Sequence, residues 1–130
     1  MTLERLWIAI AAVLGGTAVA AGAFATHALK PQLSDRLLAV FETAARYQMY
    51  HALALLLVVL IRSQGLGASG WLTAAGWAFI AGTAVFSGSL YALALSGQTI
   101  LGAVAPVGGA ALIAGWSCLL AAGLLGAAKS

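Results

Sequence analysis

Charged side chains are scarce in this chain of 130 residues: only 7% of the residues are charged, whereas 63% are hydrophobic. Soluble domains carry about 25% charged residues, so the six basic and three acidic side chains present here cannot cover a globular surface. Disordered chains are polar and rich in charge, and the same composition excludes them. These exclusions leave an integral membrane protein of a single domain.

Metal-binding and catalytic signatures are also missing. The only cysteine, Cys118, excludes an internal disulfide framework and a cage of cysteine ligands. Two histidines and three carboxylates suit a zinc or copper site poorly, so we expect no metal and no cofactor. The net charge of +3 is too small for a nucleic-acid binder. The short motifs of serine hydrolases, P-loop proteins, zinc proteases and dinucleotide enzymes are absent, and we expect a protein that is not an enzyme.

Long apolar runs are what the sequence has instead. A helix needs about 20 apolar residues to cross a hydrocarbon core of about 30 Å. The sequence predicts four such spans, the second with a polar helical start from residue 34, at about residues 6–26, 42–62, 71–95 and 100–125. The alternation of barrel strands is absent. We therefore expect an all-α fold, an integral membrane four-helix bundle that forms a single membrane domain over residues 1–130.

Local signals predict where these helices begin and end. Pro31 disfavours helical geometry at Lys30, and Ser34 is suited to cap the helix that follows. Pro106 is expected to kink the last helix or to cap its start. The first span ends in Ala-Phe-Ala (residues 23–25), which resembles a signal-peptide cleavage site. Its apolar stretch is longer than a signal core, and we expect it to be retained.

Small residues recur at helix-packing spacing in the first span, as in the pairs Ala11/Gly15 and Ala18/Gly22. Such small-xxx-small pairs allow two helix backbones to approach closely in lipid. The last span carries a similar face with several glycines, among them Gly108. These faces predict close helix contacts within the protein or with a partner.

Polar side chains concentrate in FETAARYQMYHALALL, residues 41–56. Glu42, Arg46 and Tyr50 recur at intervals of four residues, which places them within about 80° of one another around a helix. Tyr47 and His51 occupy the adjoining arc. An unpaired charge at mid-bilayer costs about 2.5–3.5 kcal/mol, so we expect these groups to face each other or other helices.

Two interpretations of this segment are open. In the structural one, Glu42 and Arg46 form a buried ion pair. Tyr47, Tyr50 and His51 are then interfacial residues or residues hydrogen-bonded within the bundle. In the functional one, the segment lines a polar cavity for a head group, a quinone-like ring or a proton. The candidate site residues are Glu42, Arg46, Tyr47, Tyr50, His51 and His27.

Four segments occur in a familiar order: GAFATHALK (22–30), FETAARYQMYHALALL, FSGSLYALALSG (86–97) and LGAVAPVGGAALIAGW (101–116). With them, the chain resembles the small bacterial inner-membrane proteins catalogued as domain of unknown function 423, related to transmembrane protein 256. The first motif of that family usually reads GAFGAHAL, from which this chain departs slightly. The resemblance implies a four-helix protein of the bacterial cytoplasmic membrane and brings no established activity.

Three classes of function are weighed. The first is an accessory or structural subunit that packs against a larger membrane complex or against copies of itself. The second is binding or translocation of a lipid or small amphipathic molecule through the polar pocket on the second helix. The third, an enzyme, lacks a recognisable nucleophile or metal. The expected partners are therefore the bilayer and a larger complex or a second copy, and not nucleic acid.

Four crossings place both termini on the same side of the membrane. The basic residues are nearly balanced between the two sides, so the positive-inside rule gives only a weak preference for one orientation in the membrane. We expect both termini to be cytoplasmic. Basic residues on that side are Arg5, Arg62 and Lys129, and those on the opposite side are Lys30, Arg36 and, unless it is buried, Arg46.

Overall fold

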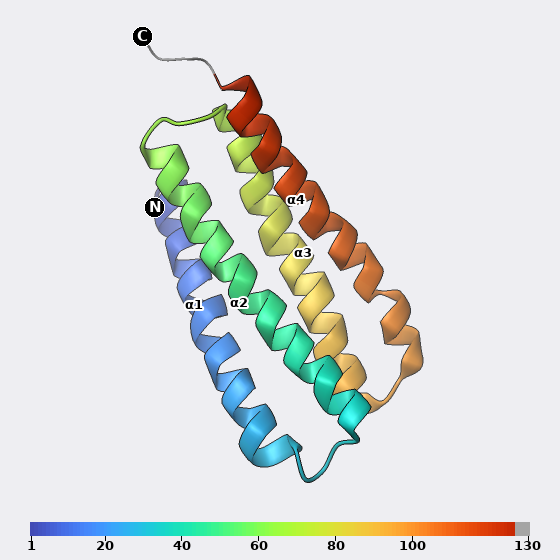
Figure 1. Ribbon diagram of the computed structural model, residues 1–130. Helices are drawn as coiled ribbons and strands as arrows, with labels where there is room; N and C mark the ends of the chain where they lie inside the picture. Colours follow the sequence, from blue (N-terminus) through green and yellow to red (C-terminus); the bar gives the residue numbers. More distant parts are fainter. Residues whose placement is uncertain (127–130) are drawn as a thin grey trace.

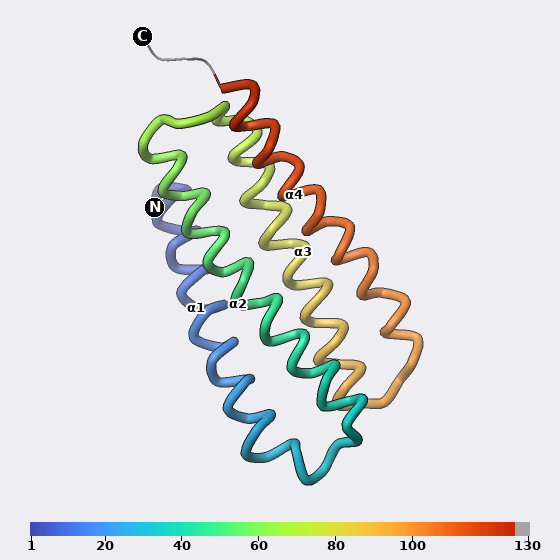
Figure 2. Tube along the Cα trace, in the orientation of Figure 1, coloured from blue at the N-terminus to red at the C-terminus, as the bar shows by residue number. Residues whose placement is uncertain are grey.

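The computed structural model describes residues 1–126 of the chain. Four long helices run alternately up and down, each beside the one that precedes it in sequence (Figure 1). The helices are α1 (Leu3–Phe24), α2 (Asp35–Ser63), α3 (Ser69–Ser96) and α4 (Ala105–Leu125). The tube in Figure 2 shows that the start of α1 and the end of α4 lie at the same end of the bundle. Lys129 lies outside the described residues.

All four helices are long and apolar enough to cross a membrane. The all-α membrane bundle predicted from the sequence is therefore confirmed. A single helical turn of π type, η1 (Ala25–Leu29), extends α1, and its last hydrogen bond joins the Lys30 amide to the Ala25 carbonyl at 3.0 Å. Such turns are rare and occur frequently at functional sites. No feature of the sequence predicted it.

Local chemistry determines several helix ends. The Ser34 hydroxyl accepts a hydrogen bond from the Leu37 amide at 3.2 Å and so caps α2, as the sequence predicted. Helix α3 is capped at its C-terminal end by Gly97, whose φ of 72° is a left-handed conformation that favours glycine. A short 3₁₀ turn, η2 (Thr99–Ala103), precedes α4, and Pro106 lies in the first turn of α4. Of the two roles expected for Pro106, the structure shows the one at the helix start.

Helices α3 and α4 approach each other through glycines. A Cβ atom on Gly108 would overlap the backbone of Phe86, and one on Gly115 would lie 2.7 Å from the Phe79 ring. From the α3 side, a Cβ on Gly82 would lie 2.8 Å from Leu112. The glycine face of α4 is therefore occupied by α3 inside the protein.

Large aromatic side chains link helices that are not neighbours in sequence. The fully buried Trp7 of α1 lies against Gly76 of α3, where a side chain would overlap its ring. Trp7 also makes an edge contact with Trp77, with ring centroids 5.7 Å apart. Trp7 belongs to a core that includes Leu55 of α2 and Leu112 of α4. This core joins all four helices.

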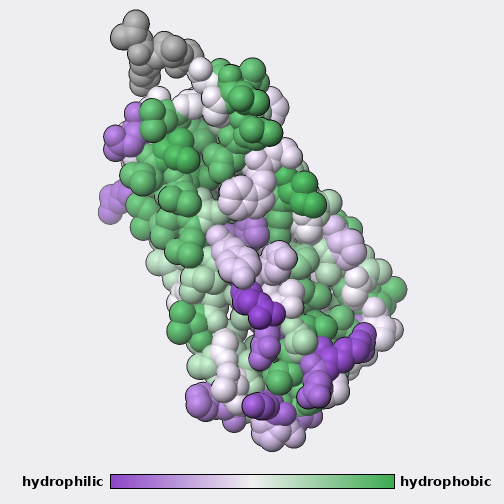
Figure 3. Space-filling model, in the orientation of Figure 1, coloured by the Kyte–Doolittle hydropathy of each residue, from purple (hydrophilic) through white to green (hydrophobic). Residues whose placement is uncertain are grey.

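Most of the visible surface is hydrophobic, as expected of a protein surrounded by lipid (Figure 3). Hydrophilic residues gather toward the ends of the bundle, and a narrow, more polar track runs along the middle of this face. At the end that holds the start of α1, Arg62 of α2 forms an ion pair with Glu4 of α1. The polar ends and apolar middle fit a bilayer.

Candidate functional site

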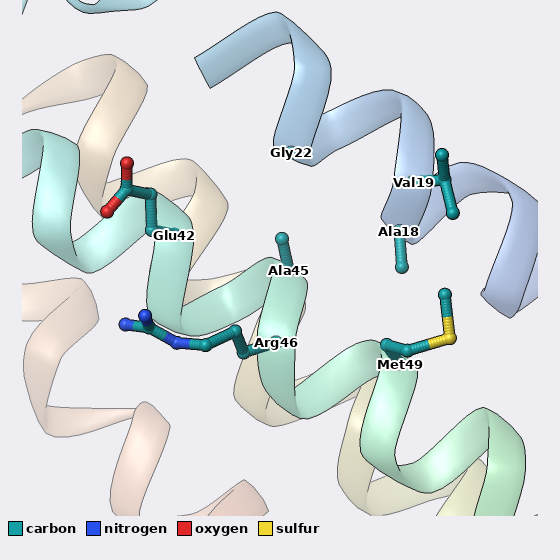
Figure 4. Close-up of a pocket in the computed structure, with 7 residues that line it drawn as sticks. All are labelled: Ala18, Val19, Gly22, Glu42, Ala45, Arg46 and Met49. Atoms are coloured by element: carbon teal, nitrogen blue, oxygen red, sulfur yellow. The ribbon is translucent and has the colours of Figure 1, made fainter. Parts of the chain in front are cut away.

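A groove of about 420 Å³ lies between α1 and α2, toward the end of the bundle that holds η1. Figure 4 shows the α1 and α2 side chains that line it. The α1 side is made of small or short residues, whereas the α2 side carries two charges. The lining residues are Ala18, Val19, Gly22, Glu42, Ala45, Arg46 and Met49.

The small residues of α1 leave the space for this groove. Ala18 is buried against α2, and the position where Gly22 would carry a Cβ has no other atom within 4 Å. Met49, three residues after Arg46 on α2, also lines the groove, with a flexible apolar side chain. The groove therefore has an apolar end, lined by Ala18, Val19 and Met49, and an end with two charged residues, Glu42 and Arg46 (Figure 4).

The depth of the two charges follows from helix geometry. At 1.5 Å per residue, Glu42 lies roughly 10 Å and Arg46 roughly 16 Å from the start of α2 at Asp35. Because α2 has 29 residues and is about 43 Å long, it extends beyond a core of about 30 Å. With α2 centred in the core, Glu42 lies near its edge and Arg46 one turn deeper.

The structure does not pair Glu42 with Arg46, contrary to the structural interpretation of the sequence. The one ion pair within residues 1–126 joins Arg62 and Glu4. Figure 4 shows the Glu42 carboxylate and the Arg46 guanidinium extending from adjacent turns of α2 without meeting. Glu42 is half-buried and Arg46 is exposed. A spacing of four residues permits an ion pair but does not determine which rotamers the side chains adopt.

Tyr47 and His51 belong to a different cavity, of about 300 Å³, between α2 and α4. The buried His51 lies 2.7 Å from the Tyr47 carbonyl through Nδ1 and 3.1 Å from Trp116 Nε1 through Nε2. Because an indole nitrogen only donates, Nε2 accepts and the proton is on Nδ1. Both ring nitrogens of His51 thus have hydrogen-bond partners within the protein.

The remaining two candidates lie apart from both cavities' linings. Tyr50 is 53% exposed on the lipid-facing side of α2 and packs against Tyr47, with ring centroids 5.5 Å apart. His27 is exposed in η1. The segment that the sequence singled out therefore divides between two faces of α2. Only Glu42 and Arg46 share the groove.

Gln48 is the polar residue that the sequence analysis missed. Its buried amide donates to the Leu14 carbonyl at 2.8 Å and to the Thr17 hydroxyl at 2.6 Å, and it accepts from the Tyr91 hydroxyl at 2.8 Å. Gln48 thereby connects α2 to both α1 and α3. The signal was available, because an amide in an apolar span must find partners in neighbouring helices.

No three histidine, cysteine or acidic side chains come together within residues 1–126. Cys118 is half-buried on α4. The groove chemistry is therefore that of one carboxylate, one guanidinium and an apolar wall.

Comparison with known proteins bears on the same segment. The family model described as "Protein of unknown function (DUF423)" matches residues 21–109, which include the charged side of the groove. The chain belongs to the DUF423 family. The UPF0382 membrane protein of Staphylococcus haemolyticus is 42% identical over 119 residues, covering 89% of this chain and 93% of its own length.

A second relative, the UPF0382 membrane protein YwdK of Bacillus subtilis, is 39% identical over 118 residues, covering 91% of this chain and 95% of its own length. No solved structure matches the chain. The names of the DUF423 relatives say that they are membrane proteins and assign no activity. They confirm the family resemblance and the membrane nature of the chain.

Proposed function

We propose that this DUF423 protein is a non-enzymatic phospholipid-binding protein of the bacterial cytoplasmic membrane, with its site in the groove between α1 and α2. The observation that carries the proposal is the pair of charges, Glu42 and Arg46, which stand unpaired with each other beside an apolar wall. Ionisable groups within membrane spans mark functional sites and are rarely left facing hydrocarbon.

A phospholipid meets the requirements of both sides of this groove. Its phosphate can accept charge-assisted hydrogen bonds from the Arg46 guanidinium, a group well suited to phosphate. Its acyl chain can lie along Ala18, Val19 and Met49, where it exchanges contact with other lipid tails for contact with apolar side chains. A groove of about 420 Å³ holds the upper part of one lipid rather than a passage through the protein.

Native mass spectrometry of the purified protein tests this proposal through the variant Arg46→Gln. We expect co-purified phospholipid on the wild type and a marked loss of it from the variant, because the phosphate loses its cationic partner. Arg36→Gln is the matched control, since Arg36 is exposed at the start of α2 and does not line the groove. Wild-type protein without bound phospholipid, or equal lipid on all three proteins, contradicts the proposal.

A second candidate function, an accessory or self-associating subunit, is favoured by glycines at which an added side chain would meet no other helix of the protein. At Gly16 of α1 and Gly88 of α3, a Cβ atom would have no other atom within 4 Å. Glycines at such positions allow another helix to approach closely in lipid. Crosslinking in native membranes tests this function, and a protein that stays monomeric at native abundance contradicts it.

For the orientation, we propose that both termini are cytoplasmic, so that the groove lies in the outer leaflet. The turn between η1 and α2 is at the end of the bundle opposite the N-terminus (Figure 1). In a Cys118→Ala background, Ser34→Cys should then react with a membrane-impermeant maleimide added to spheroplasts, from which the outer membrane barrier is removed. Labelling only after the inner membrane is opened would reverse the orientation.

A further inference from the structure

The two charges of the groove stand in a definite order along the membrane normal. Glu42 is one turn closer than Arg46 to the N-terminal end of α2, a difference of about 6 Å at 1.5 Å per residue. Figure 4 shows the two side chains extending from adjacent turns of α2. The outer position is therefore anionic and the deeper position is cationic.

We propose that the groove selects a zwitterionic phospholipid whose head group carries a primary ammonium, such as phosphatidylethanolamine; this inference rests on the proposed lipid binding. In the proposed pose, the phosphate of such a lipid lies beside its acyl chains in the groove and its ammonium points outward from the phosphate. The phosphate then meets Arg46, and the ammonium meets Glu42. Each charged group of the lipid then faces a side chain of opposite charge on α2.

Hydrogen-bonding capacity distinguishes this head group from other common ones. A carboxylate such as that of Glu42 only accepts hydrogen bonds, and a primary ammonium donates three. The trimethylated ammonium of phosphatidylcholine has no N–H to donate. The glycerol of phosphatidylglycerol carries no positive charge, so the negative lipid would leave Glu42 unneutralised beside its phosphate. The predicted preference is therefore for the primary ammonium.

The groove also has room for the head group where the ammonium must lie. Gly22 of α1 faces the Glu42 side of the groove, and no atom lies within 4 Å of the position a Cβ would take. Glu42 itself is half-buried rather than extended into water. A head group that reaches Glu42 can thus exchange its water for a direct charge-assisted hydrogen bond.

The experiment is a competition followed by native mass spectrometry. Delipidated protein in detergent receives equal amounts of dioleoyl phosphatidylethanolamine, phosphatidylcholine and phosphatidylglycerol, so that only the head groups differ. We expect phosphatidylethanolamine to be favoured over each competitor by about tenfold, the effect of one charge-assisted hydrogen bond. Glu42→Gln should abolish this preference while phospholipid still binds, whereas Arg46→Gln should weaken binding of all three.

Asp35→Asn is the matched control for Glu42→Gln, because Asp35 is an exposed acid of the same helix outside the groove. It should keep the wild-type preference. Thermal unfolding in detergent checks that every variant is folded. Equal binding of the three lipids by the wild type, a preference for phosphatidylglycerol, or a preference that survives Glu42→Gln overturns the head-group inference and leaves lipid binding standing. If none of the three lipids binds, both the head-group inference and the proposed lipid binding are overturned.

Discussion

Replacing Gln48 by methionine should destabilise the bundle by about 2 kcal/mol. Methionine has a similar length and shape, but it removes the three interhelical hydrogen bonds that Gln48 makes to Leu14, Thr17 and Tyr91. Interhelical hydrogen bonds in membrane proteins contribute about 0.6 kcal/mol each on average. Three such bonds give the expected figure. The Thr17 hydroxyl still donates to the Val13 carbonyl at 2.7 Å. The Tyr91 hydroxyl, in contrast, loses the acceptor of its hydrogen bond.

The assay is reversible unfolding in mixed micelles, in which the fraction of denaturing detergent is raised and the loss of helix is followed by circular dichroism. Gln98→Met is the matched control, because Gln98 is exposed in the turn after α3. The same chemical change there should alter the free energy of unfolding by no more than about 0.5 kcal/mol.

A double-mutant cycle with Tyr91→Phe isolates one bond of the network. The coupling free energy between Gln48→Met and Tyr91→Phe should be about 0.6 kcal/mol and no more than about 1.7 kcal/mol. If Gln48→Met behaves like Gln98→Met, or if the coupling is zero, Gln48 does not hold the three helices together and the reasoning is refuted.

Two further predictions concern glycines. Gly108→Ala should destabilise the protein by about 1–3 kcal/mol, because the new methyl group overlaps the Phe86 backbone; Gly123→Ala, which meets nothing within 4 Å, should be neutral or slightly stabilising in the same unfolding assay. Gly22→Leu should fill the groove and abolish phospholipid binding in native mass spectrometry, whereas Gly16→Leu, on the same helix but outside the groove, should leave it unchanged; lipid retained by Gly22→Leu would place the site elsewhere.

The number of helices and most of their ends could be predicted because these depend on local properties. Hydrophobic length predicts the crossings, and capping by Ser34 needs only one side chain and the next turn of backbone. The π turn at Ala25–Leu29 could not be predicted in this way, because its residues have no distinctive propensity. Its geometry depends on how the chain leaves α1 to meet α2.

The candidate site was predicted in part. Ionisable residues in an apolar span are visible in any sequence, so Glu42, Arg46 and His51 were all identified. Their partners were not, since a helical spacing leaves the rotamers open: Glu42 and Arg46 do not pair, and His51 bonds to Trp116, 65 residues away in sequence. Gln48 was missed because its partners come from two other helices.

The amino-acid sequence by itself determined that this is a membrane protein with four spans, since crossing a bilayer depends on apolar length and on little else. Only the tertiary structure decided which side of each helix faces its neighbours. In water an apolar stripe marks the buried face of a helix, but lipid is as apolar as a protein core. Burial in this bundle is therefore decided by close approach at glycines such as Gly108 and by hydrogen bonds such as those of Gln48.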